Sequence, residues 1–218
     1  MIVAAVPARD FATAKQRLAR VLRADERAAL ARAMLEDVLA ATCGACVETV
    51  LVVTADPLVS ACARACGAVV LPEAAARGHT DAVARAQAVA VERGADLFLT
   101  IPGDVPCATT DEIETVLHAA DGPRSAVFVP SVSGDGTNAA ALCPPDALPL
   151  TFGEPSFANH LAAARASDLM PVVLVLPGLG LDIDTEADLR ELLARPGPTR
   201  TSRLLETWRI STRLTPGD

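Results

Sequence analysis

Short apolar runs of strand length alternate with segments of helical length, and this rhythm restricts the fold more than any other feature of the chain. Apolar runs at 2–6, 47–53 and 68–71 are separated by segments at 25–41 and 57–66 that have the character of helices. An order of strand, helix and strand predicts parallel pairing with right-handed crossovers. The sequence therefore predicts an α/β protein with a mostly parallel sheet.

One later connection is too short to contain a helix. An apolar run at 125–130 is followed by a small polar turn at 131–138, which opens onto another apolar run at 139–142. Such a connection joins antiparallel strands, because a parallel pair needs a longer crossover. We therefore expect one antiparallel strand in a mixed sheet.

A carboxylate stands where one of the expected strands ends. The apolar run at 97–101 stops at a Pro-Gly pair, and the next residue is Asp104. Ligands of α/β sheets bind at the carboxyl ends of the parallel strands, although a lone aspartate there also fits a turn or a helix cap. A second acidic pair, Asp182 and Asp184, follows the last expected strand, at 171–176, and favours a site.

Three basic residues follow the first expected strand within nine positions: Arg9, Lys15 and Arg17. On a loop at the carboxyl end of that strand they could bind a polyphosphate. The alternative interpretation is a solvated surface loop. The glycine-rich patterns G-x-G-x-x-G and G-x-x-x-x-G-K-[ST] are missing from the sequence. Their absence argues against a standard dinucleotide-binding fold and against a P-loop protein.

Two loops lead into expected helices, and each contains glycine. Gly78-His79-Thr80 precedes a helix expected at 82–93, and backbone N–H groups at such a position can hold a base or a phosphate. The alternatives are that Thr80 only caps this helix and that His79 is only an exposed side chain.

The second loop contains Gly153 and precedes a helix expected at 156–166. Ser156 is expected to cap this helix, and backbone N–H groups beside the two residues could bind an anion.

The composition excludes several classes of function. A net charge of −8 over 218 residues argues against a general nucleic-acid binder, because affinity for a phosphate backbone needs a surplus of Lys and Arg. No uninterrupted apolar run reaches about 18 residues, so we expect no membrane span. The start of the chain has the character of a strand rather than of a signal peptide, which makes the cytoplasm the expected location.

The length fits one α/β domain and is short for two. We expect a nucleotidyltransferase domain at 1–195 and a C-terminal tail at 196–218, in which one short helix could form.

Six cysteines raise the question of zinc. Cys43-x-x-Cys46 is followed by Cys62-x-x-x-Cys66, but these pairs flank an expected strand in alanine-rich surroundings, where Cys acts as a small hydrophobe. Reduced, buried thiols are the favoured interpretation.

Acidic clusters at strand ends, combined with a basic loop, are what Mg²⁺-dependent phosphoryl chemistry requires. Mg²⁺ usually binds through one or two carboxylates plus substrate phosphates. The metal neutralises phosphate charge and aligns nucleophile and leaving group, so little other machinery is needed. In agreement, the chain has no G-x-S-x-G elbow, no Cys-His signature and no tyrosine.

Seven short motifs also occur together, in the order VPAR (6–9), AKQRL (14–18), VVTADP (52–57), IPGDVP (101–106), GTNA (136–139), FGEPSFANH (152–160) and LDIDT (181–185). As a set they resemble the 2-phospho-L-lactate guanylyltransferase family of coenzyme F420 biosynthesis. The resemblance extends from the first strand to about Leu193 and leaves out the residues after Pro196.

The resemblance implies a three-layer α/β/α nucleotidyltransferase fold, also used by the molybdenum-cofactor nucleotidylating enzymes. It implies transfer of GMP from GTP to 2-phospho-L-lactate, phosphoenolpyruvate or 3-phosphoglycerate, with release of pyrophosphate and with Mg²⁺ as cofactor. Further partners would be the downstream F420-precursor transferase, by functional coupling, and a second copy in a homodimer.

The resemblance also implies roles for site residues: metal-binding acids, groups that hold the acceptor phosphate, a basic loop at the GTP phosphates, and a loop beside the base. The metal-binding acids would be Asp104, Asp182 and Asp184, and the acceptor phosphate would be held by Thr137, Gly153 and Ser156. The basic loop at the GTP phosphates would contain Arg9, Lys15 and Arg17, and the loop beside the base would contain Gly78, His79 and Thr80. Arg9 stands where the family usually has Lys, and Gly-His-Thr-Asp at 78–81 replaces the more typical Gly-Leu-Asn-Ala.

Three other functions stay open. One is a nucleotidyltransferase of the same fold that acts on a pterin cofactor or a sugar phosphate. The second is a catalytically silent nucleotide-binding protein, and the third is a glycosyltransferase that uses Asp182 and Asp184 to bind its metal. The acceptor acid and the oligomeric state also stay open, because a methyl or hydroxyl group on the acceptor alters only a few contacts.

Overall fold

The computed structural model describes residues 1–73, 78–195, 197 and 199–214 of the chain. Within them, seven strands form one sheet in the order β3-β2-β1-β4-β6-β5-β7. The strands are β1 (Ile2–Pro7), β2 (Thr49–Thr54), β3 (Val69–Pro72), β4 (Leu97–Thr100), β5 (Ser125–Pro130), β6 (Thr137–Cys143) and β7 (Val172–Val173). β6 is antiparallel to both of its neighbours, and the other pairs are parallel. The predicted mixed sheet with one antiparallel strand is confirmed.

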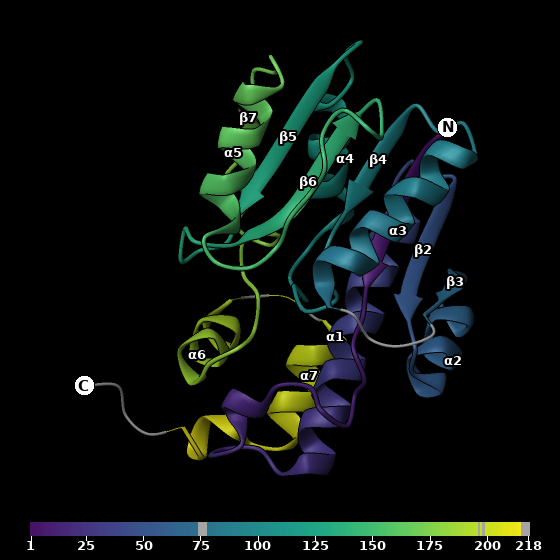
Figure 1. The fold of residues 1–218 in the computed structure, drawn as a ribbon. Coiled ribbons are helices and arrows are strands. Elements are labelled where there is room, and N and C mark those ends of the chain that lie inside the picture. The colour runs from purple at the N-terminus through teal and green to yellow at the C-terminus, as the bar shows by residue number, and fades with distance from the viewer. Residues whose placement is uncertain (74–77, 196, 198, 215–218) are drawn as a thin grey trace.

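Helices cover both faces of this sheet, as Figure 1 shows with α3 and α5 in front and α1 and α4 behind. The helices are α1 (Ala24–Gly44), α2 (Pro57–Ala65), α3 (His79–Glu92), α4 (Thr110–Ala119), α5 (Ser156–Ala166), α6 (Glu186–Ala194) and α7 (Arg200–Thr207). Short helical turns lie at Gln16–Leu18 and Ile210–Thr212. The arrangement has the three α/β/α layers that the motif resemblance implies.

The alternation of side chains along each strand produces two hydrophobic cores. Val3 and Ala5 of β1 point into the core beneath α3 and α5, whereas Ala4 and Val6 point into the core beneath α1, α2 and α4. Both sets are almost wholly buried. A strand buried on both faces must be apolar at successive positions, which explains the continuous apolar runs in the sequence.

The antiparallel direction of β6 determines which residues meet at one edge of the sheet. β1, β2 and β4 run in the same direction, so their carboxyl ends lie together. β6 pairs with β4 in the opposite direction, so its first residues, Thr137 and Asn138, lie at that same edge. Residues from the start of β6 therefore join those that follow the ends of the parallel strands.

Several predicted elements differ by a few residues from their observed bounds, and two of these differences have a structural reason. The last strand, predicted at 171–176, consists only of Val172–Val173, because it lies at the sheet edge and pairs with β5 alone. The helix predicted at 82–93 begins earlier, at His79. Gly78 has a φ of 103°, a backbone conformation that favours glycine, and it allows the chain to turn into the helix one turn sooner.

The C-terminal segment packs on α1. The carboxylate of Asp37 on α1 accepts hydrogen bonds from the backbone N–H groups of Arg200 and Thr201, at 2.9 and 2.8 Å, and from the Thr201 hydroxyl. Leu205 and Ile210 are completely buried in the same core as α1. The division of the chain at residue 195 stays a prediction.

The cysteines do not all have the predicted environment. Cys62 is buried, but Cys43 and Cys46 are exposed because they lie at and just beyond the end of α1. Burial raises the pKa of the Cys62 thiol to about 12, which keeps it protonated. No helix among the described residues is both long and apolar enough to cross a membrane.

Candidate active site

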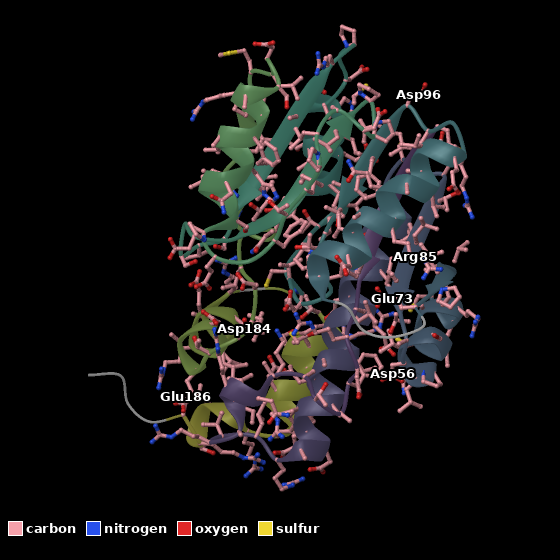
Figure 2. The ribbon with its side chains drawn as sticks, viewed as in Figure 1. Asp56, Glu73, Arg85, Asp96, Asp184 and Glu186 are labelled. Atoms are coloured by element: carbon pink, nitrogen blue, oxygen red, sulfur yellow. The ribbon has the colours of Figure 1, made fainter. Side chains whose placement is uncertain are left out.

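Two adjoining cavities, of about 470 and 530 Å³, lie at the carboxyl ends of β1, β2 and β4. Pro7, Ala8, Arg9 and His79 line both of them. The first cavity also contains Lys15, Arg17, Asp104 and Asp184, and the second contains Thr54, Asp56, Glu73 and Gly78. Figure 2 shows Asp184 beside α6 and, on the other side of this edge, Asp56 and Glu73 near α2 and β3.

Lys15 joins two of the three predicted metal-binding acids, and we call Lys15, Asp104 and Asp184 the acid–lysine cluster. The Lys15 ammonium lies 2.7 Å from Oδ2 of Asp104 and 2.8 Å from Oδ1 of Asp184. Its side chain is only 8% exposed. Lys15 was predicted to face a polyphosphate, but in this structure its charge is paired with the two carboxylates.

The pKa values in the acid–lysine cluster follow from burial and from this pairing. Burial disfavours the charged form of Asp104, but the Lys15 ammonium outweighs it and holds the pKa of the Asp104 carboxyl below its usual value. Burial likewise opposes the charge of Lys15, and the two carboxylates outweigh it and raise the pKa of Lys15. Asp104 and Lys15 are therefore both charged near neutral pH.

Asp182, the third acid, lies outside the lysine pairing. Its Oδ1 accepts a hydrogen bond of 3.1 Å from the Asn138 amide, which also donates to the carbonyl of Gly180 at 3.0 Å. Burial and the negative charges of Asp104 and Asp184 raise the pKa of Asp182, and the Asn138 hydrogen bond partly opposes this rise. Asn138 occurs in one of the motifs, but the sequence analysis gave it no role.

The acid-bearing loops are held together through the backbone. The N–H of Ile183, between the two acids of the second loop, donates to the carbonyl of Asp104 at 3.1 Å. The carboxylate of Asp188 accepts from the N–H groups of Asp184 and Thr185, at 2.9 and 2.7 Å. Asp188 therefore forms the capping box of α6 with Thr185 and fixes the direction of the chain at Asp184.

Glu112, on α4, anchors the start of the same loop. Its two carboxylate oxygens accept from the N–H groups of Gly178 and Leu179, at 2.7 and 3.0 Å. A side chain at position 178 would place its Cβ 2.2 Å from the carbonyl oxygen of Cys107, so only glycine fits this approach. No sequence pattern marked Glu112, because its partners lie 66 and 67 positions away.

The other basic residues of the predicted phosphate loop are exposed. Arg9 lies between the two cavities, and the guanidinium of Arg17 lies 4.0 Å from Oδ2 of Asp184. Lys15 has a φ of 55°, an uncommon conformation for a residue with a side chain. This turn of the backbone brings the buried ammonium of Lys15 and the exposed guanidinium of Arg17 to the same carboxylate, that of Asp184.

At the start of α3, the structure separates the roles of three predicted residues. Gly78 and His79 line the cavities, and burial lowers the pKa of His79. The Thr80 hydroxyl instead accepts from the N–H of Phe152 at 2.9 Å and lies 3.2 Å from the carbonyl of the same residue. The alternative of Thr80 as a helix cap is wrong, because the N-cap residue is Gly78.

Two of the three predicted acceptor residues meet near a buried histidine, and we call Thr137, Ser156 and His160 the threonine–histidine cluster. The Ser156 hydroxyl accepts from the N–H of Thr137 at 3.0 Å, and Thr137 Oγ1 lies 2.9 Å from Nδ1 of His160. The expected cap by Ser156 is wrong, because Pro155 is the N-cap residue of α5 and makes no side-chain cap. Gly153, with a φ of 120°, lies on the loop before this helix.

The three carboxylates provide a donor set that fits a hard divalent cation. Two of them pair with one buried ammonium, and burial already raises the pKa of the third, Asp182. In the described part of the chain, no three His, Cys, Asp or Glu side chains stand close enough together to hold a metal ion as they are. Lys15 bridges Asp104 and Asp184 in this arrangement, so a cation held by both carboxylates would have to displace its ammonium.

The fold is that of nucleotidyltransferases. A protein from Desulfovibrio desulfuricans G20, described as a nucleotide-diphospho-sugar transferase, superposes with a TM-score of 0.78 at 17% identity, over 97% of this chain and 96% of its own. A nucleotidyl transferase from Methanothermobacter superposes with a TM-score of 0.63 at 19% identity, over 95% and 99% of the two chains. At these identities the likeness concerns the fold alone.

The family follows from the sequence. Residues 2–217 match the family model described as "Guanylyl transferase CofC like". The chain is 41% identical to a phosphoenolpyruvate guanylyltransferase of Sphaerobacter thermophilus, over 87% of this chain and 91% of the relative. It is 33% identical to a 3-phospho-D-glycerate guanylyltransferase of Colwellia psychrerythraea, over 71% and 73%. The protein belongs to the CofC-like guanylyl transferase family, and the match includes the residues after 196.

Proposed function

We propose that this protein transfers GMP from GTP to a small phosphorylated acid, with phosphoenolpyruvate as the first candidate, and releases pyrophosphate. The product would enter coenzyme F420 biosynthesis. The observation that carries the proposal is the meeting of Asp104, Asp182 and Asp184 with a basic loop at one edge of a nucleotidyltransferase sheet. Relatives named as phosphoenolpyruvate guanylyltransferases support this choice of acceptor.

The two cavities suggest how the nucleotide would lie. The cavity of about 530 Å³ has largely apolar walls, including Val53, Pro57 and Leu58, which suit a nucleoside. The neighbouring cavity holds the charged groups, which suit a triphosphate. Arg9 and His79 line both cavities, so they would lie near the junction of ribose and phosphates.

Asp104, Asp182 and Asp184 would hold Mg²⁺. When bound, the metal would neutralise phosphate charge and orient the leaving pyrophosphate. Lys15, released from its two carboxylates, would donate to the GTP phosphates from the same cavity. Arg17, already exposed at this cavity, would add a second positive charge.

The threonine–histidine cluster would bind the phosphate of the acceptor beside this site. An oxygen of that phosphate attacks the α-phosphorus of GTP, and the bond from this phosphorus to the oxygen that bridges to the β-phosphorus breaks. The attacking phosphate is already ionised, so no general base is needed.

Pyrophosphate release tests the proposal. The protein would be incubated with GTP, ATP or CTP and Mg²⁺, against phosphoenolpyruvate, 2-phospho-L-lactate and 3-phosphoglycerate. The downstream F420-precursor transferase would be present to consume an unstable product. We expect a signal with GTP and one acid. Release only with a pterin or sugar phosphate, or GTP binding without release, would refute the proposal in favour of one of the alternatives.

A further inference from the structure

His160 is the buried histidine of the threonine–histidine cluster, and the proposed reaction gives its ring no part of its own. It lies on α5, it is 0% exposed, and both of its ring nitrogens have partners. Nε2 lies 3.0 Å from the backbone nitrogen of Thr151, and Nδ1 lies 2.9 Å from Oγ1 of Thr137.

These two contacts determine which nitrogen carries the proton. A backbone N–H can only donate, so Nε2 must offer a lone pair to Thr151. The proton of the neutral ring is then on Nδ1, which donates it to Thr137 Oγ1. Burial lowers the pKa of His160 to about 4, so the ring stays neutral over the physiological range.

The ring has little freedom to turn over and exchange these roles. The imidazole stacks on Phe128 at a centroid distance of 5.4 Å and an interplanar angle of 3°. The ring centroid of Phe152 lies 5.1 Å from that of His160 in an edge-on arrangement, and the backbone N–H of Phe152 donates to the Thr80 hydroxyl. A flipped ring would turn C–H groups toward Thr151 and Thr137.

The hydroxyl of Thr137 is left with a hydrogen to donate. Because its oxygen accepts from His160, the hydrogen must point away from the ring. Ser156 is in the same situation, since its oxygen accepts from the N–H of Thr137. These two side chains are 6% and 3% exposed, and no other hydrogen bond of either hydroxyl occurs among the described residues. An oxyanion that reached either oxygen would find a hydrogen to accept.

We propose that His160 is a positioning residue that holds the Thr137 hydroxyl as a hydrogen-bond donor, turned toward the phosphate of the acceptor acid. This inference rests on the proposed function and adds a determinant of acceptor affinity to it. The Thr137 hydroxyl accepts from the ring, so its hydrogen stays available for the ligand. His160 thereby selects for a fully ionised oxyanion at this subsite, because an ionised oxygen is the stronger hydrogen-bond acceptor.

Two amide substitutions separate the two nitrogens of the ring. The amide of asparagine can place an N–H near the position of Nδ1, and the amide of glutamine can place an oxygen near that of Nε2. His160→Asn therefore keeps the donor to Thr137, whereas His160→Gln keeps only the acceptor for Thr151. We expect His160→Gln to raise the KM for the acid about tenfold and His160→Asn to raise it less than about threefold, with the KM for GTP changed less than about twofold in both.

A double-mutant cycle with Thr137→Val separates positioning from a general structural role. If His160 acts through the hydroxyl, His160→Gln will have little further effect on the KM for the acid once the hydroxyl is gone. Melting temperatures of all variants identify any that fail to fold. Two outcomes would overturn the inference. In one, His160→Asn and His160→Gln raise the KM for the acid equally, and their effects add to that of Thr137→Val. In the other, the variants raise the KM for GTP as much as the KM for the acid.

Nitrogen NMR of the wild-type imidazoles gives a readout that does not depend on turnover, because the two tautomers have different nitrogen shifts. We expect Nδ1 of His160 to be protonated and Nε2 not. A proton on Nε2 in a protein that turns over GTP would overturn the role of His160 alone. Absence of turnover with every acid, from folded protein, would overturn the proposed function and the acceptor role together.

Discussion

The acid–lysine cluster and the threonine–histidine cluster lie at the same edge of the sheet, but they are prepared for a ligand in opposite ways. In the first, Lys15 is paired with Asp104 and Asp184, so its donors are already in use. In the second, neutral groups in a buried network leave hydroxyl hydrogens to offer. A charged ligand must therefore rearrange the pairing in the first cluster, whereas the hydroxyl hydrogens of the second are committed to no partner among the described residues.

The difference follows from the energetics of burial. An unpaired buried charge is very costly, so a protein without its ligand must neutralise its own acids and cations. A hydroxyl with one partner costs much less when its second hydrogen bond is missing. Charged sites are therefore found in a self-compensated state, and neutral polar sites can be preorganised.

The largest effect is expected when the acids of the first cluster lose their charge. Asp104→Asn or Asp184→Asn should lower turnover at least about a thousandfold, because neither amide can replace a carboxylate as a Mg²⁺ ligand. Pyrophosphate release measures the loss, and circular dichroism checks the fold. Asp146→Asn, at an exposed position just beyond the end of β6, is the matched control. Near-normal turnover in both site variants would refute the metal assignment.

Removal of the internal cation tests whether the first cluster must open. Lys15→Gln should lower turnover about a hundredfold, because a charge at the phosphates is lost. The same variant should gain more thermal stability from Mg²⁺ than the wild type does, because the metal no longer competes with the ammonium. Arg17→Gln, which removes an exposed charge 4.0 Å from Asp184, should show a smaller change in both measurements. An equal Mg²⁺ effect in the wild type and Lys15→Gln would show that the pairing does not resist the metal.

Asn138 links the threonine–histidine cluster to the third acid, since it neighbours Thr137 and donates to Asp182. Asn138→Ala should lower kcat about tenfold by releasing Asp182, and Asn138→Asp should lower it further, because a fourth carboxylate would face Asp182. Steady-state kinetics measures both variants. If the Asp variant were as active as the Ala variant, charge at this position would not matter and Asn138 would only fill space.

The smallest expected effect concerns stability rather than turnover. The pKa of His160 is about 4 in the folded protein against 6.5 for a free histidine, so the unfolded chain binds a proton more readily. The free energy of unfolding should therefore fall as the pH drops from about 6.5 toward 4, by roughly 3 kcal/mol in all. Urea unfolding of the wild type and His160→Gln at several pH values isolates this contribution. Parallel pH profiles would mean that His160 is not the group responsible.

The sequence predicted the elements well where the signal is local. Asp104 was found because an apolar run ends beside it, and the antiparallel strand was found because the turn before it is short. The side-chain partners were not found, because they come from distant positions. Lys15 and Asp184 are 169 residues apart, and Thr80 and the residue it holds, Phe152, are 72 apart.

Hydrogen-bond roles were the least predictable part of the site. Ser156 precedes a helical segment and has the residue type of a cap, but its hydroxyl is used by a strand on the other side of the loop. His160 stands in the middle of a helix, where nothing local distinguishes a buried ring from an exposed one. Both roles depend on which element packs against the helix, and this is decided by the whole sheet.

The hairpin between β5 and β6 also determines how such a protein can diversify. Thr137 and Asn138 are reached through an exposed turn at 132–135, whereas the parallel strands are connected through helices that carry the core. Changes in the length or composition of this turn would alter the surroundings of Thr137 and Asn138 without disturbing the strands that lead into the two cavities. Under the proposed function, acceptor preference and nucleotide preference would therefore evolve separately on one scaffold.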